Sequence, residues 1–322
     1  MNKLLEVKDL KIYYPVHENK GAHTVKKQLK AVDGVSFDVY AGETFGIVGE
    51  SGCGKTTTGK AIVRLLKPTG GTVLFEGQDV HRRASRAEQR ALAREIQLIF
   101  QDPYSSLDPR FTVGRIIGEP LTVHRLGGAA ERREKVLSLM RDVGLGEQQY
   151  AKFPHEFSGG QRQRIGVARA LALNPKLIVC DEPVSALDVS IQAQILNLLQ
   201  DLQKKYNLTY IFISHNLSVV KHLCTRIMVM YLGNVIELCE TDELFDNPRH
   251  PYTEALLSAI PVPDPKHARE MQGLEGDVPS PINPPSGCCF RTRCPYADAQ
   301  CAAEKPVLRD IGGGHRVACH KR

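Results

Sequence analysis

The sequence lacks both a long hydrophobic run and the apolar core of a secretory leader. No stretch of about 18 consecutive apolar residues occurs along its 322 residues, so we expect no segment to span a membrane. Met1 leads at once into the strand-like residues 4–7 (LLEV), without an intervening signal-peptide core. We therefore expect the chain to stay in the cytosol, where any membrane role comes through partner subunits.

A strong excess of one charge, tryptophan and internal repeats are also missing. The formal net charge of +6 fits a nucleotide binder or a protein near an anionic membrane, but it is too weak to indicate a nucleic-acid partner. The hydrophobic share of 42% and the charged share of 24% are ordinary, so a sizeable core is expected. Without a repeat, the length accommodates one large or two modest domains and not a tandem pair.

Cysteine is present but unevenly placed. In a reducing cytosol, a cluster near the end of the chain indicates a metal site before it indicates disulfides. Four of the nine cysteines are scattered and five crowd the last 35 residues; they are Cys53, Cys180, Cys224 and Cys239, then Cys288, Cys289, Cys294, Cys301 and Cys319.

The hydrophobic pattern predicts alternating strands and helices, and therefore a mostly parallel sheet. Residues 15–30 carry four lysines and are predicted as an exposed hairpin tip or loop, while residues 85–150 have helical periodicity. Nine prolines between residues 248 and 285 predict an irregular linker. Strands are predicted at 4–14, 31–48 (with a buried strand at 44–48), 177–181, 209–213 and 226–231, and helices at 55–66, 158–173 and along the face of Ile191, Ile195, Leu198, Leu199 and Leu202.

Residues 49–56 (GESGCGKT) match the phosphate-binding pattern G-x-x-x-x-G-K-[ST] between a predicted strand and a predicted helix. The glycines let backbone N–H groups converge on phosphate oxygens, and the helix N-terminus favours the negative charge. Lys55 is expected to reach the β- and γ-phosphates, and the Thr56 hydroxyl to bind Mg²⁺. The predicted phosphate-binding residues are Gly49, Ser51, Gly52, Cys53, Gly54, Lys55, Thr56 and Thr57.

Two carboxylates follow the apolar run at 177–180 (LIVC). Asp181 would be costly at the end of a buried strand unless it is paired or bound to a metal, so it is the expected Mg²⁺ partner. Glu182 is then placed to orient or deprotonate an attacking water molecule.

The sequence S-G-G-Q at 158–161 cannot serve the chain's own ATP and makes sense when it faces the ATP of another subunit. With the two motifs above it resembles the ATP-binding cassette (ABC) ATPases over residues 4 to about 240, and Phe157 stands where Leu is usual. The resemblance implies that Ser158, Gly159, Gly160 and Gln161 cap the γ-phosphate of a head-to-tail partner. It also implies a Q-loop glutamine at Gln101, a D-loop ending at Asp188, a switch histidine at His215 followed by Asn216 in place of Asp, and adenine stacking on Tyr14, with Tyr13 as the alternative.

The fold implied by the resemblance is α/β: a P-loop NTPase cassette with a RecA-like core, an antiparallel β edge and an inserted helical subdomain. We expect a nucleotide-binding domain at 1–240, with the helical insertion at about 85–165, and a proline-rich, cysteine-rich extension at 241–322. The activity implied is hydrolysis of ATP coupled to transport.

Within the ABC ATPases, the chain resembles the subunits of dipeptide and oligopeptide importers. The residues that carry this are 102–109 (DPYSSLDP), 155–158 (HEFS), 183–194, 247–253 (NPRHPYT) and the cysteine-rich end. The resemblance implies a paralogous ATPase in a heterodimer, two permeases, a substrate-binding protein and a peripheral place on the cytoplasmic face of the membrane, with no nucleic acid. The alternatives are an importer of nickel, glutathione or antimicrobial peptides, an exporter, and a soluble ABC protein acting on ribosomes or DNA.

Four cysteines match the C-terminal motif of this branch: Cys288, Cys294, Cys301 and Cys319. The resemblance implies that they hold an iron–sulfur cluster, expected as [4Fe–4S]. Four thiolates also suit zinc, and spacing alone does not decide. Cys289 is then spare, and His320 is a possible substitute ligand.

Overall fold

The computed structural model describes residues 2–20, 23–260 and 276–322. The chain forms two compact units. One is built mainly from Arg82–Ile213 and contains the S-G-G-Q sequence, so we call it the signature unit. The other combines Lys3–Val39, Thr44–His81 and Ser214–Arg322, and we call it the phosphate-loop unit.

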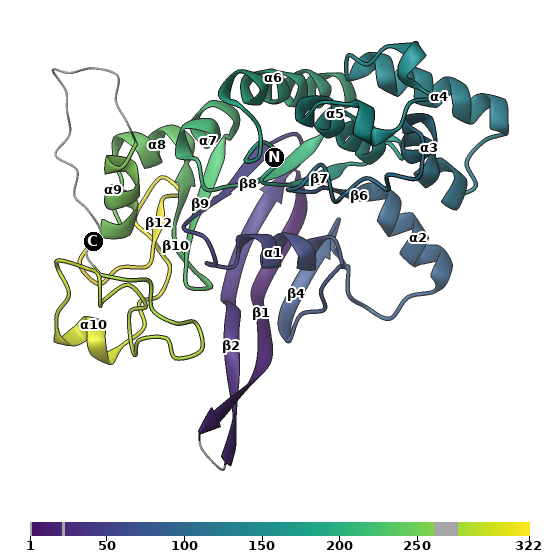
Figure 1. Ribbon diagram of the computed structural model, residues 1–322. Coiled ribbons are helices and arrows are strands. Elements are labelled where there is room, and N and C mark those ends of the chain that lie inside the picture. The colour runs from purple at the N-terminus through teal and green to yellow at the C-terminus, as the bar shows by residue number, and fades with distance from the viewer. Residues whose placement is uncertain (1, 21–22, 261–275) are drawn as a thin grey trace, which may run out of the picture. The chain divides into compact units, whose positions relative to one another are not determined.

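The N-terminal part of the phosphate-loop unit is a four-stranded sheet in the order β2-β1-β4-β5. Figure 1 shows β1 and β2 as a long ribbon. Most of residues 15–30 belong to these strands, so their prediction as a tip or loop was wrong, and residues 21–22 lie outside the described residues. Exposed and half-buried positions alternate from 26 to 29, as in a two-stranded ribbon with one face more exposed to solvent than the other. The strands are β1 (Lys3–Lys20), β2 (His23–Tyr40), β4 (Gly70–Phe75) and β5 (Gln78–Asp79).

A second sheet in this unit carries the phosphate loop. Strand β3 (Thr44–Val48) runs parallel to β9 (Arg226–Tyr231), with Val48 opposite Val229, and every residue of β3 is buried. The other strands of this sheet that belong to the unit are β10 (Asn234–Glu240), β11 (Arg309–Asp310) and β12 (Arg316–Val317). The described helices of the unit are α1 (Lys55–Ile62), α7 (Leu217–Leu223), α8 (Thr241–Asp246), α9 (Pro251–Ser258) and α10 (Ala299–Ala303). Helix α1 begins where predicted and ends four residues earlier.

The signature unit places three parallel strands among its helices. Strands β6 (Ile96–Ile99), β7 (Leu177–Asp181) and β8 (Thr209–Ser214) pair side by side, which confirms the two later strands. The helical periodicity predicted over 85–150 did not show β6, because four residues are too few to show a period. The helices are α2 (Arg86–Glu95), α3 (Val113–Val123), α4 (Ala129–Asp142), α5 (Gly159–Leu171) and α6 (Val189–Tyr206), with short 3₁₀ turns at Glu147–Gln149 and Pro154–Glu156.

The predicted linker at 248–285 is only partly irregular. Pro251 is the first residue of α9, where a proline loses no hydrogen bond. The prediction of an irregular linker was therefore wrong for this helix. Residues 261–275 lie outside the described residues, and residues 276–285 contain no helix or strand. In the described parts of the chain, no helix has both the length and the apolar character needed to cross a bilayer.

Candidate nucleotide site

The phosphate loop links β3 to α1 in a backbone conformation that needs glycine. Gly49 has φ +148° and Gly54 has φ +103°. A Cβ added at Gly49 would lie 2.2 Å from the Met230 carbonyl oxygen, and one added at Gly54 would lie 2.2 Å from that of Ala31. These positions therefore accept no side chain, and the loop is seated tightly on the backbone around it.

Lys55 is buried and hydrogen-bonded within the phosphate loop. Its side chain is 4% exposed. The Nζ donates to the carbonyl oxygens of Gly49 at 2.7 Å and Glu50 at 2.9 Å, and its third contact is the sulfur of Cys53 at 3.8 Å. An ammonium has three N–H donors and sulfur is a weak acceptor, so one donor is readily turned to a phosphate oxygen.

The two tyrosines considered for adenine stacking have different surroundings. The Tyr13 hydroxyl donates to the carboxylate of Asp33, and Lys30 Nζ lies 5.6 Å from the centre of its ring. Burial together with that hydrogen bond raises the pKa of Tyr13. Tyr14 is 38% exposed. The geometry favours Tyr14, because stacking needs an accessible ring face.

His215 stands exposed directly after β8, as the sequence predicts. Asn216, which stands where Asp is usual, has a defined structural role. Asn216 is the N-cap of α7, and its side-chain oxygen accepts from the N–H groups of Ser218 at 3.0 Å and Val219 at 3.5 Å. The neighbour of the histidine is therefore fixed by the helix that follows.

In the signature unit, the predicted catalytic carboxylate and the Q-loop glutamine are in contact. Gln101 Nε2 donates to Glu182 Oε2 at 3.0 Å. Glu182 has φ +44°, which is uncommon for a residue with a side chain, and its N–H donates to the carbonyl of Ile213 at 3.0 Å. Asp181, the last residue of β7, is 5% exposed. Strained backbone of this kind concentrates at functional sites.

The S-G-G-Q sequence forms the start of α5. The Ser158 hydroxyl accepts from the N–H of Gln161 at 3.4 Å, and the Gln161 side chain accepts from the N–H of Ser158 at 3.1 Å. This capping box leaves Ser158 exposed, while Phe157 is 4% exposed and supplies the apolar anchor. A Cβ on Gly160 would lie 2.5 Å from Ile191 of α6. Asp188 is the exposed N-cap of α6.

Sequence reasoning missed how α5 holds the segment that follows Gln101. The Arg169 side chain donates to the Ser106 carbonyl at 2.6 Å and lies 5.7 Å from the centre of the Phe100 ring. Arg162 stacks on Tyr104, with its Cζ 4.0 Å from the ring centre. The only available signal in the sequence was the run of arginines after S-G-G-Q. This run does not indicate which residues the arginines contact.

The predicted metal ligands meet different tests. Oxygen donors at Thr56 and Asp181 are of the kind Mg²⁺ takes, together with water and phosphate oxygens. Among the described residues, no group of three or more His, Cys, Asp or Glu side chains is arranged to hold a metal ion. The described residues therefore give no support to a preformed metal site in the tail.

The tail cysteines nevertheless influence one another. Burial raises the pKa of the Cys288 thiol, and neighbouring Cys301, Cys319 and Cys294 raise it further. Burial also raises the pKa of Cys294, with Cys319 and Cys301 adding to the rise. The N–H of Cys288 donates to the Cys301 carbonyl at 2.8 Å. His320, the possible substitute, has its Nε2 3.0 Å from the Glu304 carbonyl oxygen.

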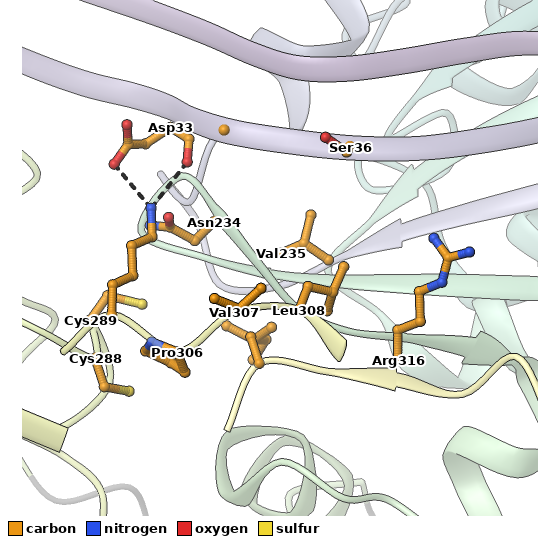
Figure 2. A pocket seen from close by; sticks show the side chains of 14 residues that line it. Asp33, Ser36, Asn234, Val235, Cys288, Cys289, Pro306, Val307, Leu308 and Arg316 are labelled. Atoms are coloured by element: carbon orange, nitrogen blue, oxygen red, sulfur yellow. Dashed lines mark hydrogen bonds and ion pairs between the residues drawn. The ribbon is translucent and has the colours of Figure 1, made fainter. Parts of the chain in front are cut away.

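A separate cavity of about 410 Å³ lies in the phosphate-loop unit (Figure 2). Its walls are largely apolar, with Val235, Val307 and Leu308 among them. Lys305 Nζ donates to the carbonyl and the carboxylate of Asp33, both at 3.3 Å (Figure 2). None of the residues of the nucleotide motifs lines this cavity.

Two family models match the chain. The model described as "ABC transporter" matches residues 32–185, and the one described as "Oligopeptide/dipeptide transporter, C-terminal region" matches residues 236–301. The second match includes most of β10 and three of the four predicted cluster cysteines.

Curated relatives are similar over nearly the whole length. The chain is 52% identical over 319 residues to the oligopeptide transport ATP-binding protein AppF of Bacillus subtilis, covering 98% of this chain and 97% of that protein. It is 54% identical over 323 residues to the oligopeptide transport ATP-binding protein OppF of Salmonella typhimurium, covering 99% and 96%.

Solved structures are similar over about three quarters of the chain. The dimeric post-hydrolysis state of the ATP-binding cassette MJ0796 bound to ADP and phosphate matches with a TM-score of 0.63 and 29% identity, covering 74% of this chain and 99% of that one. CbiO1 from Clostridium perfringens, part of the ABC transporter complex cbiONQ, matches with a TM-score of 0.64 and 28% identity, covering 77% and 92%.

Proposed function

The chain belongs to the ABC transporter ATPases, and from this membership we propose that it energises the import of di- and oligopeptides through membrane permeases. One observation carries the proposal: identity of 54% to an oligopeptide transport ATP-binding protein over 99% of the chain. That identity extends through the C-terminal region, which a bare ABC cassette does not have: the cassette of MJ0796 is covered to 99% by 74% of this chain.

ATP hydrolysis follows from the motif residues in the roles proposed for them. Backbone N–H groups of the phosphate loop and the Lys55 ammonium bind the phosphates, and Thr56, Gln101 and Asp181 hold Mg²⁺. When bound, Mg²⁺ neutralises charge on the phosphate oxygens. Glu182 orients the attacking water and accepts its proton, and His215 aligns the γ-phosphate. The remaining nucleotide contacts are proposed at Tyr14, Gly49, Ser51, Gly52, Cys53, Gly54 and Thr57.

A second ATPase subunit completes each site in the proposal. The α5 N-terminus, with Ser158, Gly159, Gly160 and Gln161, is offered to the γ-phosphate of the opposite subunit, where helix polarity and N–H groups favour an anion. Asp188 contacts the partner's site. We place a paralogous ATPase opposite this chain, two permeases above it and a substrate-binding protein beyond, with the chain on the cytoplasmic face of the membrane.

The extension at 241–322 is proposed to hold a [4Fe–4S] cluster on Cys288, Cys294, Cys301 and Cys319. Its support is that burial raises the pKa of Cys288 and of Cys294, and that nearby Cys301 and Cys319 raise both further. Zinc is the alternative metal at this site. Chemical analysis of purified protein for iron, acid-labile sulfide and zinc tests it; stoichiometric zinc without iron would refute the cluster, and replacement of Cys294 and Cys301 by Ser should remove any absorbance near 400 nm.

The transport proposal is tested by purifying the tagged chain from detergent-solubilised membranes and identifying its partners by mass spectrometry. Two permeases and a second ATPase are expected. Uptake of a labelled tripeptide should stop when the gene is deleted and return with the wild-type chain but not with Glu182→Gln. Recovery with ribosomal or DNA-repair partners, or intact peptide uptake in the deletion, would overturn the proposal while leaving the ATPase chemistry in place.

A further inference from the structure

The C-terminal tail reaches the phosphate loop through one residue, Glu50, the second position of the loop. The Glu50 carboxylate accepts two hydrogen bonds from the Arg293 guanidinium, at 2.9 Å from Nη1 and 3.3 Å from Nη2. Such a two-pronged pair fixes orientation as well as distance. The Arg293 side chain is only 6% exposed and that of Glu50 is 25% exposed, so the pair is shielded from solvent on the arginine side.

The backbone of Glu50 is also held. Its N–H donates to the hydroxyl of Tyr252 at 2.9 Å, and its carbonyl accepts from Lys55 at 2.9 Å. Glu50 is therefore hydrogen-bonded at its amide, its carbonyl and its carboxylate. Two of these three contacts come from beyond residue 240, and the third comes from the lysine expected to bind phosphate.

The residues that supply these contacts are themselves locked in place. Tyr252 and Phe290 are completely or almost completely buried, and their ring centres lie 5.4 Å apart. Both rings pack on Tyr231 at the end of β9, with centres at 4.8 Å and 5.3 Å. Arg293 follows three residues after Phe290, and its Cζ lies 5.9 Å from the Tyr231 ring centre. A rigid aromatic cluster thus sets where the guanidinium can be.

We propose that Arg293 is a positioning residue for ATP binding: through Glu50 it fixes the phosphate loop in the conformation that receives the β- and γ-phosphates. It does not touch the nucleotide itself. Without it, the loop samples other conformations, and the fraction able to bind ATP falls. The inference uses the ATPase chemistry of the chain and is independent of the transported solute.

The test is a double-mutant cycle on the full-length protein, with ATP affinity and steady-state ATPase kinetics as readouts. Arg293→Gln and Glu50→Gln should each raise the KM for ATP about tenfold, which corresponds to about 1.4 kcal/mol, while kcat changes less than about twofold. The double variant should be no worse than either single one, since both break the same contact. Arg293→Lys keeps the charge but not the fork, and should recover part of the affinity.

Lys305→Gln is the matched control, because it removes another ion pair between the tail and the N-terminal sheet, to Asp33, at 3.3 Å. It should leave the KM for ATP within about twofold of the wild type. Thermal unfolding of every variant separates positioning from simple loss of stability. An unchanged KM in Arg293→Gln, or effects that add in the double variant, would overturn the proposal, as would an equal rise of KM in Lys305→Gln.

Discussion

Two helix N-termini are proposed to bind phosphate, and they are capped in opposite ways. Helix α1 starts after Gly54, a left-handed residue without a side chain, so no side-chain cap is present. Helix α5 starts with Ser158 and Gln161, which cap each other's backbone N–H groups. The start of α1 is thus left for a ligand, whereas the start of α5 is stable before any ligand arrives.

The difference teaches how each terminus obtains its rigidity. The loop before α1 contains three glycines with positive φ and is held from outside, by the seat on Met230 and Ala31 and by contacts to Glu50. The α5 terminus is held from within, by a box of four residues. The terminus proposed for the chain's own ATP is thus held by residues distant in sequence, and the one proposed for a partner's ATP is held by its own residues.

Glu182→Gln separates the two functions most sharply and should have the largest effect. It keeps the size of the side chain and removes the carboxylate that accepts a proton, so turnover should fall by about 10²–10⁴-fold. Binding at the α1 terminus should be unaffected, because the glutamate is not part of it. ATPase assays and equilibrium binding of ATP to the same preparation check this; retained turnover would remove Glu182 from the role of base.

Gly54→Ala attacks the open terminus directly. The new Cβ would meet the Ala31 carbonyl at 2.2 Å in a backbone with φ +103°, so the loop has to move. Strain and overpacking of about 3 kcal/mol together should weaken ATP binding about 100-fold.

Gly77→Ala is its control. Gly77 has φ +77° and nothing lies within 4 Å of an added Cβ. This variant therefore has the strain of a positive φ, as Gly54→Ala does, but not the steric clash. Its stability should fall by about 1 kcal/mol with ATP affinity unchanged. Equal loss of affinity in both variants would mean that the effect is general destabilisation and not closure of the phosphate loop.

Ser158→Ala and Ser85→Ala probe the closed terminus. Both serines cap a helix with a glutamine or glutamate three residues later, and both variants should lose about 1 kcal/mol of stability. Only Ser158→Ala should also lower ATP turnover, by at least about tenfold, because only that cap is proposed to face a γ-phosphate. Identical ATPase rates in the two variants would reduce Ser158 to a structural cap.

The phosphate loop and the capped start of α5 could be predicted from the sequence because their rules are local. Glycines at fixed spacing, a lysine and a following helix determine the first, and the S-G-G-Q spacing determines the second. The strand ending at Asp181 was predictable for the same reason, since the four apolar residues at 177–180 (LIVC) lead directly into a carboxylate.

What could not be predicted depends on partners far away in the chain. Arg293 and Glu50 are 243 residues apart, and nothing near either residue announces the other. The continuation of β1 and β2 into residues 15–30 was not predicted, because the lysines there favour a loop. Asn216 departs from the family pattern and caps α7, but Asp caps a helix equally well, so the cap does not explain the substitution.

The smallest expected effect concerns pH and the docking of the tail. His315 Nε2 lies 2.7 Å from the fully buried carboxylate of Glu237, and its Nδ1 lies 3.3 Å from Glu243. The hydrogen bond to Glu237, with that carboxylate's charge and Glu243, raises the pKa of His315 above its ordinary value of 6.5. The stability it adds is therefore complete below pH 6.5 and is lost as pH rises through the raised pKa.

His250 makes the opposite contribution on the acid side. Burial lowers the pKa of His250 to about 4, so its stabilising effect is present above pH 6.5 and is lost as pH falls toward 4.

Thermal unfolding from pH 4 to about pH 9 should show a maximum of stability between these two losses. His315→Gln should flatten the alkaline side and leave the acid side unchanged; an alkaline loss that persists in this variant would show that the tail is not held by the charged pair. Because the same tail carries Arg293, ATP affinity measured along the alkaline side should weaken with the loss of stability in the wild type and not in His315→Gln.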